Sequence, residues 1–292
     1  MVDRLLGLST FILASPFSNQ DAAAFDKVAS WGYDLIEVCI ENPDILSADW
    51  VAEQSNRSGL KVGICGAFGP LRDISSENQA IRESARTYLM GCVDFAARVG
   101  SPHVAGPMYA TTGVARPLSP SDRAAQRTRA AEGLREVAHY AAEVGVALAI
   151  EPLNRFETDL VNTLAQGVEL CELIGLDNVG LLIDTFHMNI EEKDFRNAIL
   201  ASGPYIRHVQ VSENDRGTPG SGHIPWTEFF SALDEIGYEG QIVVESFLES
   251  VEEIARAVSL WRPVADSMDD LAAEGFAFLT SMGAAGRGVD RG

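Results

Sequence analysis

Three carboxylates that could hold a metal ion stand at the ends of apolar segments, and a glutamine lies within a fourth such segment. Glu151 closes "VALAIE", Asp184 closes "VGLLID", and Glu245 closes "QIVVE", while Gln210 lies within "HVQVS". Carboxylates gathered in a site of low dielectric constant repel one another, and their pKa values rise unless a cation neutralises them. A divalent metal is the simplest resolution. The alternative for any single carboxylate is that it caps the next helix or pairs with an arginine.

These residues belong to a regular alternation of short apolar segments and helical ones. Segments such as "IRESARTYLMGCVDFAARVG" have helical spacing and end on a glycine. Strands that are apolar on both faces and alternate with helices predict a parallel sheet covered by helices. The expected strands are Leu5–Ser9, Leu35–Ile40, Lys61–Cys65, His103–Gly106, Val146–Ile150, Val179–Asp184, His208–Ser212 and Gln241–Glu245.

Eight such units favour an α/β fold with a single closed (β/α)8 TIM barrel over an open, doubly wound sheet. The usual nucleotide-binding markers of the open sheet, GxGxxG and GxxxxGK[ST], are missing. We expect the barrel to span residues 1–283 and the glycine-rich residues 284–292 to form a flexible tail. In a barrel, side chains at the carboxyl ends of the strands meet on one face, where active sites lie.

Charge and composition exclude several classes of partner. The net charge of -20 argues against nucleic acid and against an anionic membrane surface. No apolar run reaches the ~20 residues that a membrane helix requires. The four cysteines are far apart and form no CxxC pair, which favours reduced thiols and a cytoplasmic protein.

Several motifs resemble those of a known family. "IEPLNRFETDLVNT", "LLIDTFHMN", "ENDRGTPGSG" and "VVESF" are similar to the D-tagatose 3-epimerase and D-psicose (allulose) 3-epimerase group of the xylose isomerase-like barrels, as are "CGAFGPLRDISSENQAIRESA" and "AGPMY". The resemblance extends from about Leu5 to Leu260. It implies a metal-dependent isomerase of carbohydrate metabolism that acts on a small sugar.

The resemblance also implies the ligands of the metal. Glu151, Asp184 and Glu245 match three of them. The fourth ligand in the 3-epimerases is a histidine six residues before an arginine; counting back from Arg216 gives Gln210 instead. Hydroxypyruvate isomerase-like members of the same superfamily use a glutamine at this strand, so Gln210 can bind through its side-chain oxygen.

An all-oxygen ligand set determines which metal we expect. Three carboxylates and an amide oxygen suit Mn²⁺, with Mg²⁺ close behind and Co²⁺ possible but weakened by the loss of an imidazole. His208 points to the same side of its strand as Gln210 but lies ~6 to 7 Å along it. We therefore expect His208 to support the site without binding the metal.

The chemistry implied by the resemblance is proton transfer next to a carbonyl. A metal that chelates a ketose stabilises the enediolate formed when a base removes the intervening proton. Epimerisation at C3 needs an acid/base group on each face, and Glu151 and Glu245 are the expected pair. His187 and Arg216 would donate to the developing oxyanion, and Glu157 would accept from a terminal hydroxyl.

These substrate-binding residues have simpler interpretations as well. His187 could cap a helix, Arg216 could be a solvated loop cation, and Glu157 could pair with Arg155. Three further residues follow strands and are expected to face the substrate, although such residues are often core: Phe11, Cys65 and Met108. No phosphate-binding glycine turn is evident, which favours an unphosphorylated substrate.

Three functions remain open from the sequence. The first is a ketose 3-epimerase. The second is another enolate reaction on the same site: an aldose–ketose isomerase of the hydroxypyruvate isomerase kind, or a lyase or decarboxylase acting on a 3-oxo sugar or 3-oxo glycoside. The third is a barrel that binds a sugar without converting it. Similar proteins are homodimers or homotetramers, and we expect the same here.

Overall fold

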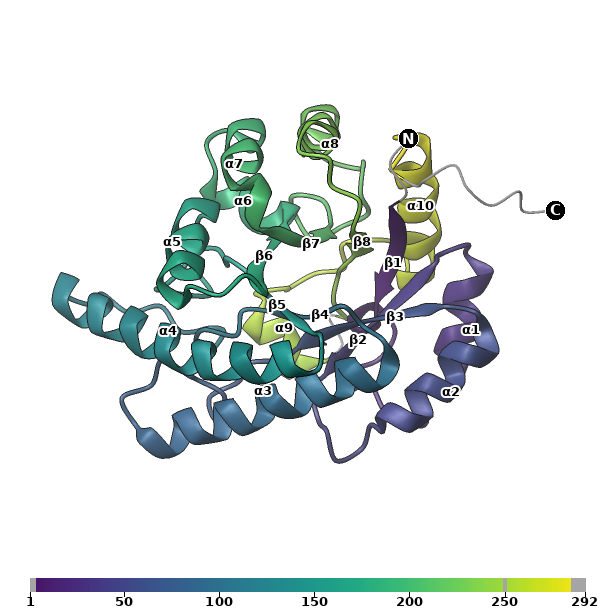
Figure 1. Ribbon diagram of the computed structural model, residues 1–292. Helices are drawn as coiled ribbons and strands as arrows, with labels where there is room; N and C mark the ends of the chain where they lie inside the picture. Colours follow the sequence, from purple (N-terminus) through teal and green to yellow (C-terminus); the bar gives the residue numbers. More distant parts are fainter. Residues whose placement is uncertain (1–3, 249–250, 285–292) are drawn as a thin grey trace.

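The computed structural model describes residues 4–248 and 251–284 of the chain. Eight parallel strands form a closed barrel in which each strand pairs with the next and β8 pairs with β1. The predicted (β/α)8 barrel is therefore confirmed, and Figure 1 shows its strands surrounded by helices. The strands are β1 (Leu5–Ser9), β2 (Leu35–Ile40), β3 (Lys61–Gly66), β4 (His103–Gly106), β5 (Ala147–Ile150), β6 (Val179–Asp184), β7 (Ile206–Val211) and β8 (Gln241–Val244).

The predicted strand boundaries hold to within two residues. The largest difference is in β7, which begins at Ile206, two residues before the predicted His208. The strand starts there because it follows the short 3-10 turn Gly203–Tyr205 without an intervening loop. The pairing of β6 with β7 contains one register shift, between Leu181 and Leu182. Beside it the backbone just before β7 passes so close to Gly180 that a β-carbon there would lie 2.2 Å from the Tyr205 carbonyl oxygen.

The helices form the outer layer and cover the strands. Most begin at a polar cap, such as the capping box in which Thr163 and Gln166 satisfy each other's backbone N–H groups. Their bounds are α1 (Ala23–Ser30), α2 (Ala48–Ser58), α3 (Gln79–Val99), α4 (Pro120–Glu143), α5 (Leu164–Ile174), α6 (Thr185–Glu191), α7 (Phe195–Ser202), α8 (Trp226–Glu235), α9 (Glu252–Ala257) and α10 (Met268–Ser281).

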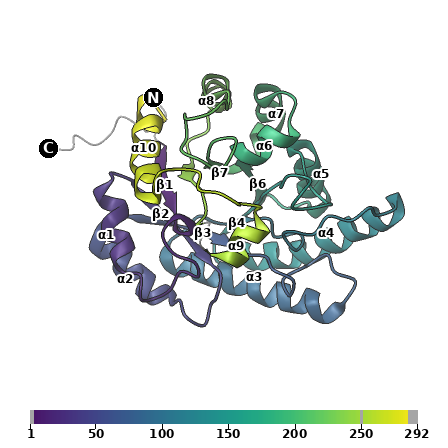
Figure 2. The same ribbon diagram turned by 180° about the vertical axis from the view of Figure 1, so that it is seen from behind.

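The last long helix closes the outer layer. Figures 1 and 2 both show α10 beside β1 and α1. Tyr33 donates to the carbonyl of Ala272, and Lys27 pairs with Asp269 across this contact. Ala284, the first residue of the predicted tail, is buried in the core, and residues 285–292 lie outside the described residues.

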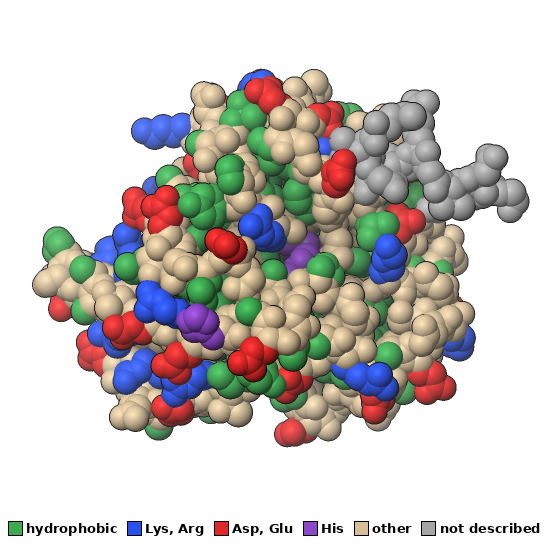
Figure 3. All heavy atoms as spheres, in the orientation of Figure 1, with side chains coloured by type: hydrophobic (Ala, Val, Ile, Leu, Met, Phe, Trp, Pro, Cys, Tyr) green, Lys and Arg blue, Asp and Glu red, His purple; other side chains and the backbone are tan. Residues whose placement is uncertain are grey.

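The surface contains mixed charges. On the face shown in Figure 3, acidic and basic side chains are interspersed among polar ones. None of the helices in the described ranges has the combination of length and apolar character needed to cross a bilayer.

The barrel interior differs from the layer between strands and helices. The space between the strands and the helices is filled by a continuous apolar cluster. Because side chains alternate along a strand, His103 and Ala105 of β4 both point into the barrel. The barrel interior also contains Glu37 and His208, which are fully buried. The rings of His103 and His208 lie 4.5 Å apart. This polar interior lies directly beneath the site described next.

Candidate metal and active site

The predicted site residues occupy the last inward positions of their strands. By alternation Glu151 follows the inward Ala149, Asp184 follows Leu182, and Gln210 and Glu245 occupy the corresponding places in or just after β7 and β8. Asp184 and Gln210 are register partners. All four side chains are buried. The barrel thus places them on one rim, as the sequence predicts.

Arg216 holds two of the carboxylates together. Its Nη1 lies 2.7 Å from Asp184 Oδ2 and 3.2 Å from Glu245 Oε2. Arg216 is 2% exposed, and its guanidinium lies over the Phe186 ring, 4.0 Å from its centroid. The interpretation of Arg216 as a solvated loop cation is therefore wrong. Its positive charge therefore lies beside two of the carboxylates that the sequence groups around a cation.

The loop that presents Arg216 is tightly constrained. Arg216 has a φ of 70°, in the left-handed region that a residue with a side chain rarely adopts. The Ser246 hydroxyl donates to its carbonyl. Glu213 anchors the loop by accepting hydrogen bonds from the backbone N–H of Gly220 and from the Trp226 indole. Glu213 thus supports the loop that presents Arg216.

His187 joins the third carboxylate to this group. Its Nε2 lies 3.3 Å from Glu151 Oε1 and 3.8 Å from Asp184 Oδ2. The backbone N–H of Asn154 donates to Nδ1 at 3.0 Å, so a neutral ring carries its proton on Nε2. Nε2 of His187 and Nη2 of Arg216, 3.0 Å apart, are then both donors, so the carboxylates rather than the histidine hold the guanidinium.

The N-terminus of α6, the helix after β6, is capped by Asp184. The Asp184 carboxylate, and not His187, caps α6 by accepting from the backbone N–H of Phe186 at 2.7 Å. Asp184 Oδ1 thus accepts the hydrogen bond from the helix backbone, while Oδ2 accepts from Arg216. One carboxylate therefore fixes the helix and faces the site at once.

Glu157 lies beside the site and has no partner in Arg155. Asn154 Nδ2 donates to Glu157 Oε1 at 2.7 Å, and Arg155 pairs with Glu191. The alternative pairing of Glu157 with Arg155 is therefore wrong. Glu157 is 4% exposed, and its pKa is raised, mainly by burial.

Burial and mutual repulsion shift the titration of the whole group. Burial and the charges of Glu245 and Asp184 hold the pKa of Glu151 well above its usual value. Burial raises the pKa of Glu245 to about 8 despite the opposing effect of Arg216. Burial and Arg216 together hold the pKa of His187 well below its usual value, which keeps the ring neutral. The carboxylates therefore have excess proton affinity that a cation would replace.

Gln210 fits a ligand role on the evidence of its own hydrogen bonds. Its amide nitrogen donates to Glu37 Oε1 at 2.6 Å, while its amide oxygen is buried without a partner among the described residues. A buried amide oxygen without a partner is costly, and a metal ion would satisfy it. Three carboxylates and this oxygen therefore form a donor set suited to a hard divalent cation.

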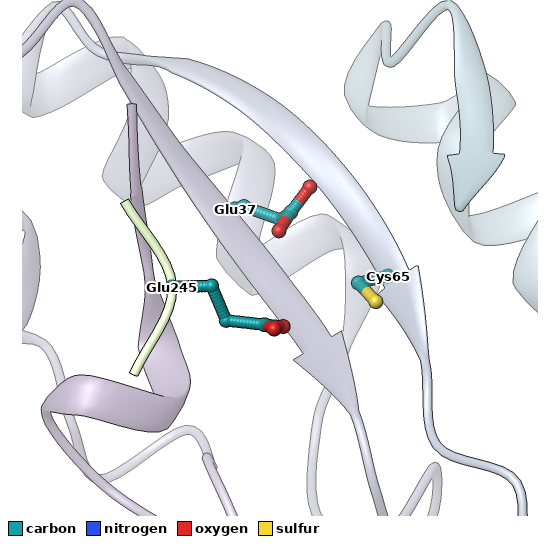
Figure 4. Close-up of side chains that lie close together, drawn as sticks. All are labelled: Glu37, Cys65 and Glu245. Atoms are coloured by element: carbon teal, nitrogen blue, oxygen red, sulfur yellow. The ribbon is translucent and has the colours of Figure 1, made fainter. Parts of the chain in front are cut away.

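Glu37 is the functional candidate that the sequence patterns did not identify. It lies in the centre of β2 and is fully buried. Figure 4 shows Glu37, Cys65 and Glu245 extending toward one another from β2, β3 and the segment after β8, and their ligand atoms lie within 4.8 Å of one another. A glutamate within the apolar "LIEVCI" was a usable signal, of the same kind as a glutamine within an apolar strand.

The three predicted pocket residues lie in two environments. Phe11 and Cys65 belong to a small apolar cluster with Phe247. The Phe247 ring centroid lies 5.0 Å from that of Phe11, with the two rings tilted by 43°, and 5.0 Å from the Arg216 guanidinium carbon. Met108 is fully buried in the main core. Contact of these three residues with substrate stays a prediction.

The fold and site define a class of protein: a (β/α)8 barrel with a buried, carboxylate-rich centre at the carboxyl ends of its strands. Residues 25–281 match the xylose isomerase-like TIM barrel family, and the chain belongs to it. The predicted membership of this family is thus confirmed.

Several relatives and solved structures to which the chain is similar are named epimerases. The chain is 32% identical to a D-psicose 3-epimerase of Agrobacterium fabrum over 84% of this chain and 85% of that protein. It is 33% identical to an L-ribulose 3-epimerase of Mesorhizobium japonicum, over 90% of this chain and 89% of that one. A solved L-ribulose 3-epimerase superimposes with a TM-score of 0.90 at 31% identity, covering 96% of this chain and 94% of that one.

Proposed function

We propose that the protein is a divalent-metal-dependent epimerase that inverts C3 of an unphosphorylated ketose. The observation that carries this proposal is the pair of buried acidic groups Glu151 and Glu245, which come from the ends of β5 and β8 and are separated by β6 and β7 around the barrel. Their raised pKa values suit groups that exchange protons near neutral pH. The naming of the relatives as ketose 3-epimerases supports the same activity.

The residues proposed to bind the metal are Glu151, Asp184, Gln210 through its amide oxygen, and Glu245. The oxygen donors favour Mn²⁺, then Mg²⁺. A divalent cation bound there would acidify the C–H bond beside the substrate carbonyl. Each glutamate has two carboxylate oxygens, so one oxygen can bind the ion while the other faces the substrate.

The protein's own groups then divide the proton transfer. One of the two glutamates takes the C3 proton from one face of the carbon, and the other delivers a proton to the opposite face, which inverts the centre. The Nε2–H of His187 and the guanidinium of Arg216 donate to the oxygen on which negative charge develops. Glu157, held by Asn154, accepts from a hydroxyl at the far end of the sugar.

Isotope exchange tests this reaction. The metal-stripped and Mn²⁺-loaded proteins are incubated in D₂O with D-fructose, D-psicose, D-tagatose, L-ribulose and a 3-oxo glucoside, and carbon-bound protons are followed by NMR. Metal-dependent exchange at C3 with appearance of the C3 epimer is expected. Exchange at C1 or C2 indicates an aldose–ketose isomerase, while loss of CO₂ or release of an aglycone indicates a decarboxylase or lyase. Absence of exchange with every sugar contradicts catalysis of this class.

A cytoplasmic location and assembly into a homodimer or homotetramer belong to the same proposal. The relatives' names place the substrate among small sugars, which supports an enzyme of carbohydrate metabolism. Size-exclusion chromatography with light scattering measures the assembly directly. A monomer at micromolar concentration would contradict the oligomeric part and leave the proposed reaction unaffected.

A further inference from the structure

Glu37 has two close partners within β7 on the far side of the barrel interior. Its Oε1 accepts from Gln210 Nε2 at 2.6 Å, and its Oε2 lies 2.6 Å from His208 Nε2. Both partners are fully buried. They are separated by one residue, so they point to the same side of β7 and meet the two oxygens of a single carboxylate.

This contact determines which end of the Gln210 amide faces the site. A carboxylate oxygen accepts the bond from the amide, which presents its nitrogen to Glu37 at 2.6 Å. The amide oxygen is then directed away from Glu37, and it has no partner within the described part of the chain. A carboxamide free to rotate could instead present its NH₂ group, which binds no cation.

We propose that Glu37 is a positioning residue that locks the carboxamide of Gln210 with its oxygen toward the metal. The inference rests on the proposed function, because it requires Gln210 to be a ligand. His208 completes the arrangement by holding the second oxygen of Glu37, which fixes the carboxylate plane. A glutamine ligand needs this support because, unlike a carboxylate, it has only one end that can bind the ion.

Outer carboxylates that orient metal ligands contribute about 10- to 100-fold to metal affinity in known sites. We expect an effect of this size for Glu37. The competing interpretation is that Glu37 itself binds the ion, since its carboxylate lies near the Glu245 carboxylate and the Cys65 sulfur. The short contacts from Gln210 and His208 to both of its oxygens favour the positioning role.

The test is a double-mutant cycle read out by metal binding. Mn²⁺ is titrated into metal-stripped wild type, Glu37→Gln, Gln210→Ala and the double variant, and free Mn²⁺ is measured by electron paramagnetic resonance. Glu37→Gln keeps the shape of the side chain but can turn an NH₂ group toward Gln210. We expect it to weaken Mn²⁺ binding 10- to 100-fold in wild type and to have little effect once Gln210 is alanine.

Each outcome of the cycle is informative. An equal loss in both backgrounds overturns the positioning role, because Glu37 then acts on the metal without Gln210. Unchanged affinity in Glu37→Gln, together with a loss in Gln210→Ala, overturns the inference alone. Unchanged affinity in Gln210→Ala removes the ligand assignment of the proposed function itself.

Folding is checked by circular dichroism and thermal melts of each metal-stripped variant. If Glu37→Gln does not fold, Glu37→Asp replaces it in the cycle. The aspartate keeps the charge but is one methylene shorter, so it withdraws from Gln210 Nε2. The expected result is again a loss of Mn²⁺ affinity in the wild-type background only, and equal losses in both backgrounds overturn the proposal.

Discussion

Metal binding to this site should be strongly coupled to proton release. The pKa of Glu245 is about 8 in the metal-free protein, and that of Glu151 is well above its usual value. A carboxylate must be ionised to bind a metal, so the cation displaces these protons. Well below pH 8, the apparent affinity for the metal falls tenfold, or ~1.4 kcal/mol, for each unit by which pH is lowered and for each proton that the metal displaces. Glu245 alone, half protonated at pH 8, thus predicts a loss of about 50-fold between pH 8 and pH 6, and Glu151 steepens the dependence.

The same linkage predicts how stability depends on pH. The pKa of Glu245 in the folded protein lies above its ordinary value of 4.5. Its contribution to stability is therefore fully present below about pH 4.5 and is lost as pH rises through about 8. Bound Mn²⁺ would offset this loss of stability by neutralising the ionised carboxylates. The rise in melting temperature on adding Mn²⁺ should therefore grow from pH 6 to pH 8.

Isothermal titration calorimetry measures this coupling directly. Mn²⁺ is titrated at pH 6, 7 and 8 in buffers of different ionisation enthalpy, which gives both the affinity and the number of protons released. Glu245→Gln should bind more weakly but with a shallower pH dependence, since one titrating group is gone. Glu132→Gln, which removes a carboxylate from the exposed side of α4, is the matched control and should behave as wild type. A flat affinity between pH 6 and 8 without proton release would refute the argument.

Three further predictions concern single substitutions. Glu245→Gln should abolish turnover in a steady-state epimerisation assay, and activity similar to wild type would exclude its acid/base role. Gln210→His should remain active and favour Co²⁺ relative to Mn²⁺ in a competition assay; an unchanged metal preference in the folded variant would count against Gln210 as a ligand. Gly180→Ala should lower the melting temperature through a cost of about 1–3 kcal/mol, because the new β-carbon meets the Tyr205 carbonyl. Gly91→Ala is its control, since a β-carbon there meets nothing within 4 Å, and a similar loss at Gly91 would contradict the steric explanation.

The barrel could be predicted because its strands are locally encoded. Segments such as Val179–Asp184 are short, apolar and β-branched, and glycines end the helices between them. The (β/α)8 topology then places every strand's carboxyl end on the same rim. Glu151, Asp184, Gln210 and Glu245 could therefore be grouped from their positions at strand ends alone.

The contacts that orient these groups could not be predicted in the same way. Glu37 and Gln210 are 173 positions apart in the chain and meet only across the closed barrel. His187 was expected beside the substrate, but its tautomer depends on the backbone N–H of Asn154 in another loop. Such contacts depend on the side-chain directions of two separate elements, which periodicity along one element does not specify.

The supporting residues explain how a glutamine can occupy a position where the related 3-epimerase pattern has a histidine. An imidazole ligand is commonly oriented by a carboxylate that accepts its second N–H. Glu37 accepts the amide N–H of Gln210 in an equivalent way, at 2.6 Å. Under the proposed ligand assignment, the carboxylate can orient either side chain, and the change from histidine to glutamine replaces a nitrogen donor by an oxygen donor while the support stays in place. Glu37→Gln should consequently weaken Mn²⁺ binding in the Gln210→His variant as well, and an undiminished affinity there would confine the role of Glu37 to the amide.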